Sequence, residues 1–136
     1  MRIFFDANVL ISAFITRKGT CASLFSLVTD NTSYKLVSGR VVLVEIERVL
    51  TKKFTFTPQK VDRLLQILER HEIVPVPQNP SLIPVRDPND TLVLASALEA
   101  KADILVTGDQ DLLELGDKAG IKIVDPRTLW GMLARK

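Results

Sequence analysis

Acidic side chains stand in this sequence at places from which they could act on a common site. Asp6 directly follows an apolar run, and Asp109 follows a second run of the same kind. Glu45 falls about one turn into a helix expected after another apolar run, and Asp90 stands where a helix is expected to begin after a proline-rich stretch. These four carboxylates are therefore considered together.

Carboxylates that converge on one pocket must take up protons or bind a cation. Two unit charges of like sign ~4 Å apart repel by about 4 kcal/mol at an effective dielectric constant near 20. Oxygen ligands without a neighbouring His or Cys suit a hard ion such as Mg²⁺ or Mn²⁺. Such an ion can activate water to attack phosphorus and can neutralise charge on the phosphoryl oxygens. The acids therefore predict hydrolysis of phosphodiester bonds.

Each of these acids also has a purely structural interpretation. An Asp after a strand often caps a helix or forms a turn, which applies to Asp6, to Asp109 and to the Asp87-Pro88-Asn89-Asp90 segment. Glu45 could be an exposed helical acid, with Glu47 as the alternative candidate at that place. The structural interpretations weaken if all four side chains reach one edge of a sheet.

Other kinds of site are poorly supported by the sequence. The single histidine, His71, falls at the end of an expected helix, and the single cysteine, Cys21, lies in an apolar stretch, so a zinc site lacks ligands. No glycine-rich phosphate loop or nucleophile elbow occurs. Trp130 lies among apolar residues and is expected in the core or in an interface.

The spacing of apolar residues predicts strands that alternate with helices. Strands are expected at residues 2–5, 34–38, 72–76, 103–107 and 122–124. Helices are expected at residues 9–15, 40–53, around 61–68, and at 91–101, 110–115 and 126–133, with Asp90 as an N-cap, Gly116 as a terminator and residues 75–88 as a loop. This alternation implies right-handed crossovers and a mainly parallel sheet with helices on both faces, which binds ligands beyond the carboxyl ends of its strands.

The 136 residues are expected to form a single domain, residues 1–136, without help from disulfides. Residues 1–80 carry eleven Lys and Arg against seven Asp and Glu, whereas residues 81–136 carry seven against nine. Six of these basic residues flank a predicted turn and form either a solvated helical face or a rim that attracts phosphates: Arg48, Lys52, Lys53, Lys60, Arg63 and Arg70. No run approaches the ~20 apolar residues that cross a membrane, and a lone cysteine suits a reducing compartment, so we expect a cytoplasmic protein.

Four segments of the sequence, in this order, resemble the PIN domain, particularly its bacterial and archaeal toxin-like, or VapC-like, branch. Asp-x-Asn alone is a weak signal, but four anchors in order are fairly specific, and the resemblance covers nearly the whole chain. The segments are Phe5-Asp6-Ala7-Asn8-Val9-Leu10, Glu45-Ile46-Glu47-Arg48-Val49-Leu50, Arg86-Asp87-Pro88-Asn89-Asp90 and Thr107-Gly108-Asp109-Gln110-Asp111-Leu112-Leu113.

The resemblance implies a three-layer α/β/α sandwich and an endoribonuclease that depends on Mg²⁺ or Mn²⁺. It implies metal ligation and catalysis by Asp6, Glu45, Asp90 and Asp109. It also implies supporting positions, which orient the ligands, at Asn8, Thr107 and Asp111. Many such proteins form homodimers, and many are toxins inhibited by a small antitoxin protein whose segment enters the acidic groove.

Two other functions remain in competition with the nuclease. One is a non-catalytic PIN-fold scaffold or nucleic-acid-binding module, against which the intact acidic set argues. The other is a phosphatase that uses Asp6 as a covalent nucleophile, as haloacid-dehalogenase-like enzymes do. Those enzymes carry a second acid two residues further on, where this sequence has Asn8.

Overall fold

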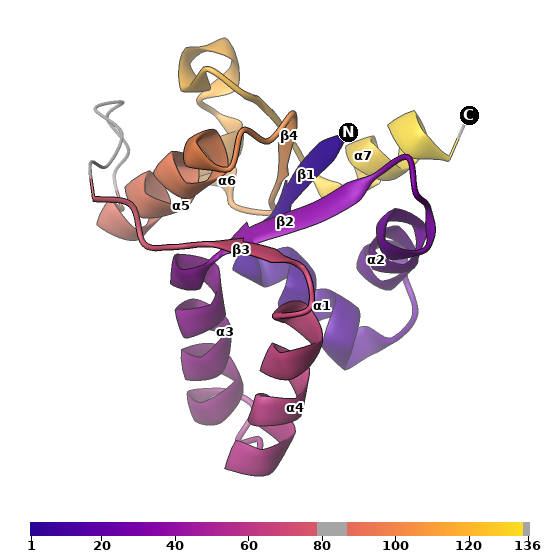
Figure 1. The fold of residues 1–136 in the computed structure, drawn as a ribbon, viewed down its shortest axis with the longest axis vertical. Coiled ribbons are helices and arrows are strands. Elements are labelled where there is room, and N and C mark those ends of the chain that lie inside the picture. The colour runs from indigo at the N-terminus through magenta and orange to yellow at the C-terminus, as the bar shows by residue number, and fades with distance from the viewer. Residues whose placement is uncertain (79–86, 135–136) are drawn as a thin grey trace.

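The computed structural model describes residues 1–78 and 87–134, which form a parallel sheet flanked by helices (Figure 1). The strands are β1 (Arg2–Phe5), β2 (Lys35–Gly39), β3 (Glu72–Val74), β4 (Ile104–Val106) and β5 (Lys122–Val124). The helices are α1 (Ala7–Thr16), α2 (Thr20–Asp30), α3 (Arg40–Lys52), α4 (Pro58–Leu68), α5 (Pro88–Glu99), α6 (Gln110–Leu113) and α7 (Pro126–Leu133), with a 3₁₀ helix η1 (Gly116–Ala119).

The order of the strands creates a switch point in the middle of the sheet. The order is β3-β2-β1-β4-β5, and every neighbouring pair is parallel. The chain runs from β1 outward to β3 and then returns to the other side of β1, while α1 to α4 lie on one side of the sheet and α5 and α6 on the other (Figure 1). The predicted three-layer α/β/α fold is confirmed. The order in which the chain adds strands to the sheet reverses between β1 and β4, and open α/β sheets bind ligands at such a point.

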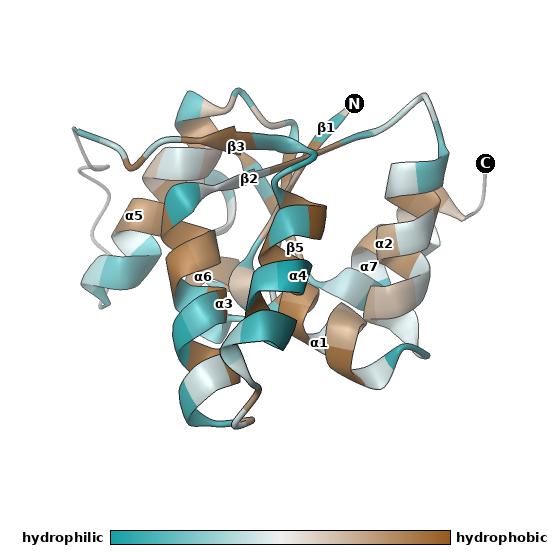
Figure 2. Cartoon of the chain, turned by 60° about the horizontal axis from the view of Figure 1, so that its bottom comes forward, coloured by the Kyte–Doolittle hydropathy of each residue, from teal (hydrophilic) through white to brown (hydrophobic). Residues whose placement is uncertain are grey.

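The two central strands are buried by helices on both of their faces. Ile3, Phe4 and Phe5 of β1 are fully buried, and so is Leu105 of β4. By contrast, the outward side of α4 is hydrophilic (Figure 2). Because both faces of a central parallel strand belong to the core, the first polar side chain is met only where the strand ends. The carboxylates of Asp6 and Asp109 accordingly stand just beyond the carboxyl ends of β1 and β4.

Helix α2 is the element that the analysis of the sequence did not predict. Its side chains Cys21, Leu24, Phe25 and Val28 stand at i, i+3, i+4 and i+7, which is the spacing of one buried helical face. The ring of Phe25 packs edge-on against Phe5 of β1, with 6.5 Å between the ring centroids. The periodicity was therefore present, but no side-chain cap marks the start of the helix at Gly19.

Two predicted helix boundaries are wrong. Asp87, not Asp90, is the N-cap of α5, because its side chain accepts a hydrogen bond from the Asn89 N–H at 2.8 Å and Pro88 occupies the first turn. Gly116 does not terminate α6, which ends at Leu113; it begins η1 in a left-handed conformation, with φ of 52°. The predicted loop at residues 75–88 lies partly outside the described residues.

Among the helices of residues 1–78 and 87–134, none is both long and apolar enough to cross a membrane.

Gly39, at the junction of β2 and α3, packs closely against α5. A Cβ atom at Gly39 would lie 3.2 Å from Cβ of the buried Ser96 and 3.4 Å from Cζ of Phe4. We predict that Gly39→Ala lowers the free energy of unfolding by about 1–3 kcal/mol, because a packed core resists an added methyl group. Urea denaturation measures the change.

Gly131→Ala in α7 is the matched control for this substitution. Nothing lies within 4 Å of a Cβ atom at Gly131, and Ala favours a helix over Gly by about 1 kcal/mol, so the control should be stabilising. Equal shifts of the two urea midpoints in the same direction would disprove the close contact at Gly39.

Candidate metal centre

The four predicted carboxylates line one pocket at the switch point between β1 and β4. Asp6 follows β1, Asp109 follows β4, Glu45 comes from α3, and Asp90 comes from the first turn of α5. The pocket has a volume of about 560 Å³, which lies within the ~300–1,000 Å³ of typical ligand sites. Acids that served only as caps and surface charges would have no reason to share one cavity.

Asp6 is almost completely buried, with 6 % of its surface exposed. One carboxylate oxygen accepts the Ala7 N–H at 2.7 Å at the start of α1, and the other accepts the Thr107 hydroxyl at 2.7 Å. Burial raises the pKa of Asp6, the two hydrogen bonds oppose this rise, and the charges of Asp109 and Glu45 add to it. The residue is therefore both a helix cap and a confined charge that a cation would stabilise.

Asn8 and Thr107 join the ends of the two central strands. Asn8 Oδ1 accepts the Gly108 N–H at 2.8 Å, and its amide nitrogen lies 3.4 Å from Thr107 Oγ1. The fully buried hydroxyl of Thr107 accepts the Asp109 N–H at 3.0 Å while it donates its own hydrogen to Asp6. These contacts fix the loop that carries Asp109 relative to Asp6, which is the geometry that a positioning role requires.

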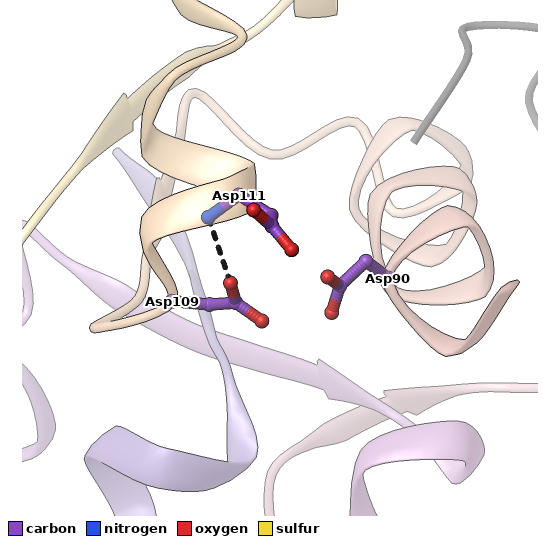
Figure 3. Close-up of side chains that lie close together, drawn as sticks. All are labelled: Asp90, Asp109 and Asp111. Atoms are coloured by element: carbon purple, nitrogen blue, oxygen red, sulfur yellow. Dashed lines mark hydrogen bonds between the residues drawn. The ribbon is translucent and has the colours of Figure 1, made fainter. Parts of the chain in front are cut away.

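Asp90, Asp109 and Asp111 bring carboxylate oxygens within 4.8 Å of one another. Figure 3 shows the side chain of Asp90 facing the other two across the space between α5 and α6. An Asp109 oxygen accepts the Asp111 N–H at 2.9 Å, which holds that carboxylate at the start of α6. Ligands on opposite sides of Mg²⁺ lie ~4.2 Å apart at usual bond lengths, so oxygen atoms this close together are compatible with such an ion.

Crowding of negative charge changes the protonation of Asp90, of which 6 % of the surface is exposed. Burial, a hydrogen bond shared with Asp109, and the charges of Asp109, Asp87 and Asp6 raise the pKa of Asp90 to about 7. Near neutral pH the pair therefore holds a proton that a divalent cation would displace.

Glu45 and Asp87 also line the pocket, but both have other contacts. Glu45 accepts a hydrogen bond from Arg48 Nε at 3.2 Å on the same helix, and Asp87 caps α5. Glu47, the alternative to Glu45, is exposed and does not line the pocket, because two positions along a helix turn a side chain to the opposite side.

Asp111, for which the resemblance implies a supporting position, lies close enough to Asp90 and Asp109 to be a further candidate ligand. It belongs to the close group with Asp90 and Asp109, whereas Asp6 and Glu45 line the pocket outside that group. Its place two residues after Asp109, in the first turn of a helix, was the available signal in the sequence.

Several pocket residues were not singled out by the sequence. Phe54 and the α1 residues Ile11, Ser12, Ile15 and Thr16 line the pocket, and so does Asn89 next to Asp90. Of the predicted basic rim, Lys53 alone is among the described residues that line this pocket. Lys60 instead lies over the ring of Phe56, 4.1 Å from its centroid.

This arrangement defines an acidic site at the switch point of a small α/β domain, and the family model of the PIN domain matches residues 2–111. The chain belongs to the PIN-domain family, as its four sequence segments predicted. No curated protein matches the chain.

Solved structures of similar fold support the same architecture. VapBC2 from Rickettsia felis, bound to a DNA fragment from its promoter, has a TM-score of 0.68 at 16 % identity, over 92 % of this chain and 98 % of that one. PAE2754 from Pyrobaculum aerophilum has a TM-score of 0.63 at 17 % identity, over 100 % and 97 %. FitAcB from Neisseria gonorrhoeae has a TM-score of 0.59 at 13 % identity, over 92 % and 98 %. At these identities the likeness shows the fold alone.

The raised pKa of Asp90 predicts how the stability of the metal-free protein depends on pH. Between about pH 4 and pH 7 the folded state keeps a proton that the unfolded chain has released, so the free energy of unfolding falls as pH rises through this window. Asp90→Asn should stabilise the metal-free protein at pH 8 by on the order of 1–2 kcal/mol, since water in the open pocket screens part of the repulsion. Urea denaturation in EDTA at pH 5 and pH 8 measures both effects.

Asp117→Asn, at an exposed position in η1, is the control for the loss of one negative charge. If the control stabilised the protein at pH 8 as much as Asp90→Asn does, the effect would belong to net charge and not to crowding in the pocket.

A divalent cation should raise the melting temperature more at pH 8 than at pH 5, because it competes with protons for the same carboxylates. Thermal denaturation with MgCl₂ or MnCl₂ measures this, with NaCl of matched ionic strength as the control. Asp109→Asn should weaken the response. A rise that NaCl reproduces would show screening and no specific site.

Proposed function

We propose that this chain is an endoribonuclease that requires Mg²⁺ or Mn²⁺ and hydrolyses RNA phosphodiester bonds. The observation that carries the proposal is the gathering of Asp6, Glu45, Asp90 and Asp109 around one pocket at the switch point. All the candidate ligands are carboxylates, which favours a hard divalent ion. Membership of the PIN-domain family, whose members are generally nucleases, supports the same activity.

In this function the polar side chains around the pocket would have different roles. Asp90 and Asp109, with Asp6 and Glu45 beside them, would hold the ion, while Thr107 and Asn8 keep Asp6 and the Asp109 loop in register. The chemistry that the ion supplies when bound is positive charge for the phosphoryl oxygens and a lowered pKa for the attacking water. The buried base of the pocket keeps the carboxylates fixed in the absence of substrate, so no reorganisation is needed at reaction.

A protein partner belongs to the same proposal. Two of the structural neighbours are the complexes VapBC2, crystallised with promoter DNA, and FitAcB. We propose that this chain is likewise the toxin of a toxin–antitoxin pair, that it forms a homodimer, and that a small antitoxin inhibits it by occupying the acidic groove. An anionic groove would attract a cationic segment of such a partner.

Removal of the carboxylate charge should abolish cleavage without unfolding the protein. Purified protein is incubated with a mixed RNA pool with and without Mn²⁺, and the ends of the products are mapped. Asp6→Asn and Asp109→Asn should lower the rate by at least about a hundredfold, because even residues that only orient a metal ligand are worth 10- to 100-fold. Asp117→Asn should cleave as the wild type does, and excess EDTA should stop all cleavage.

The same experiment separates the competing functions. RNA binding without cleavage across varied RNAs would reject the nuclease in favour of the non-catalytic module. A phosphoryl adduct on Asp6 would instead support the phosphatase. Induced expression in a bacterial host should slow growth for the wild type and not for Asp6→Asn; equal growth of both would contradict the toxin assignment while leaving the nuclease in place.

A further inference from the structure

The pocket continues beyond the carboxylates as an apolar shelf that metal binding does not use. Ile11 and Ile15 of α1, Val49 of α3 and Phe54 line this part, together with the polar side chains of Ser12, Thr16 and Lys53. Phe54 keeps 42 % of its surface exposed and Ile15 keeps 36 %, although both face the pocket. Such exposed apolar side chains beside a polar centre mark a surface for contact with a ligand.

Phe54 belongs to the turn in which the chain leaves helix α3. Helix α3 ends at Lys52, and the N–H groups of Lys53 and Phe54 both point to the Val49 carbonyl, at 2.8 and 3.4 Å. Thr55 then adopts a left-handed conformation with φ of 49°, which is rare for a β-branched residue.

The side chain of the next aromatic residue, Phe56, packs against the core, whereas that of Phe54 is exposed. The backbone N–H of Phe56 donates to the Leu50 carbonyl at 3.0 Å, its side chain packs on the core, and Lys60 covers its ring. The two rings lie 6.3 Å apart at 60°. Phe56 is thus half-buried against the core, whereas Phe54 is exposed and lines the pocket.

We propose, resting on the nuclease function above, that this shelf is a subsite for one unpaired nucleotide next to the scissile phosphate. Its base lies on Phe54 and against Ile15, and its phosphate pairs with the Lys53 ammonium. Three observations favour a nucleotide: the shelf belongs to the same pocket as the carboxylates, the exposed side chain of Phe54 is aromatic, and the preceding residue, Lys53, also lines the pocket. Aromatic faces beside basic side chains are the common means of holding single-stranded nucleic acid.

The same geometry selects unpaired RNA over a duplex. A base inside a helix is stacked on both faces and has none free for Phe54, whereas a base in a loop can leave the stack. The carboxylates repel every phosphate until a divalent cation neutralises them, so Lys53 gives the neighbouring phosphate a point of attachment away from that negative charge.

Binding and cleavage are measured separately to test this subsite. A fluorescein-labelled unpaired RNA octamer is titrated in Ca²⁺, which accepts carboxylate ligands, and the same octamer is cleaved in Mn²⁺. Phe54→Ala should weaken binding on the order of tenfold, and Phe54→Trp should restore it. Trp130→Ala is the matched control, since Trp130 is an aromatic residue with 38 % exposure outside this pocket.

An abasic nucleotide placed at each position of the octamer in turn gives the decisive comparison. At one position the missing base should weaken binding to the wild type about tenfold and should leave binding to Phe54→Ala unchanged, because the two changes remove the same contact. Equal penalties in both proteins at every position would overturn the subsite. So would a dimer that Phe54→Ala dissociates while RNA binding stays unchanged, since the shelf would then bind a second copy of the chain.

The outcomes also distinguish this inference from the nuclease proposal. If the wild type shows the positional pattern in binding but cleaves no RNA in Mn²⁺, the nuclease fails and the subsite stands as a binding site. If the wild type cleaves RNA and Phe54→Ala does so with the same KM and no positional pattern, the subsite fails and the nuclease stands.

Discussion

Asp90 and Asp109 approach one another across the space between α5 and α6, and the repulsion between their carboxylates governs the protonation of the site and its affinity for cations. Because Asp90 is almost completely buried and lies close to Asp109, burial and the charge of Asp109 raise the pKa of Asp90 to about 7, so the pair holds a proton near neutral pH. Asp6 adds a third charge at the bottom of the same pocket. The folded protein therefore carries an electrostatic cost at this edge, which a divalent cation would relieve.

The scaffold withstands this cost because its polar contacts are arranged around the carboxylates. Thr107 and Asn8 connect the ends of β1 and β4. The backbone N–H groups at the starts of α1 and α6 donate hydrogen bonds to the carboxylates of Asp6 and Asp109. Each Asp at these starts thus has a structural contact and a charge to offer to an ion. Capping and metal binding are compatible here, because a carboxylate oxygen that accepts one hydrogen bond keeps a second lone pair for an ion.

The two halves of the pocket depend on different physical interactions. The carboxylate half acts through charge, at the end of the sheet where buried strands release their first polar residues. The apolar half offers exposed apolar surface for contact with a ligand. It lies where α3 ends, at Phe54, which is followed by Thr55 in a left-handed conformation. In the proposed function, a nucleic acid strand fits both halves, because a divalent cation would join its phosphates to the carboxylates and its unpaired bases would contact the apolar half.

The sequence by itself determined the layered fold and the identity of the acids, because buried parallel strands require unbroken apolar runs and an Asp after such a run stands at the carboxyl edge of the sheet. The apolar periodicity of α2 is also present in the sequence. Only the packing of distant segments brings Asp111 close to both Asp90 and Asp109 and makes Phe54 part of the same pocket. These features depend on the packing of α3, α5 and α6 around the switch point, and contacts between segments distant along the chain leave no periodic trace in any one of them.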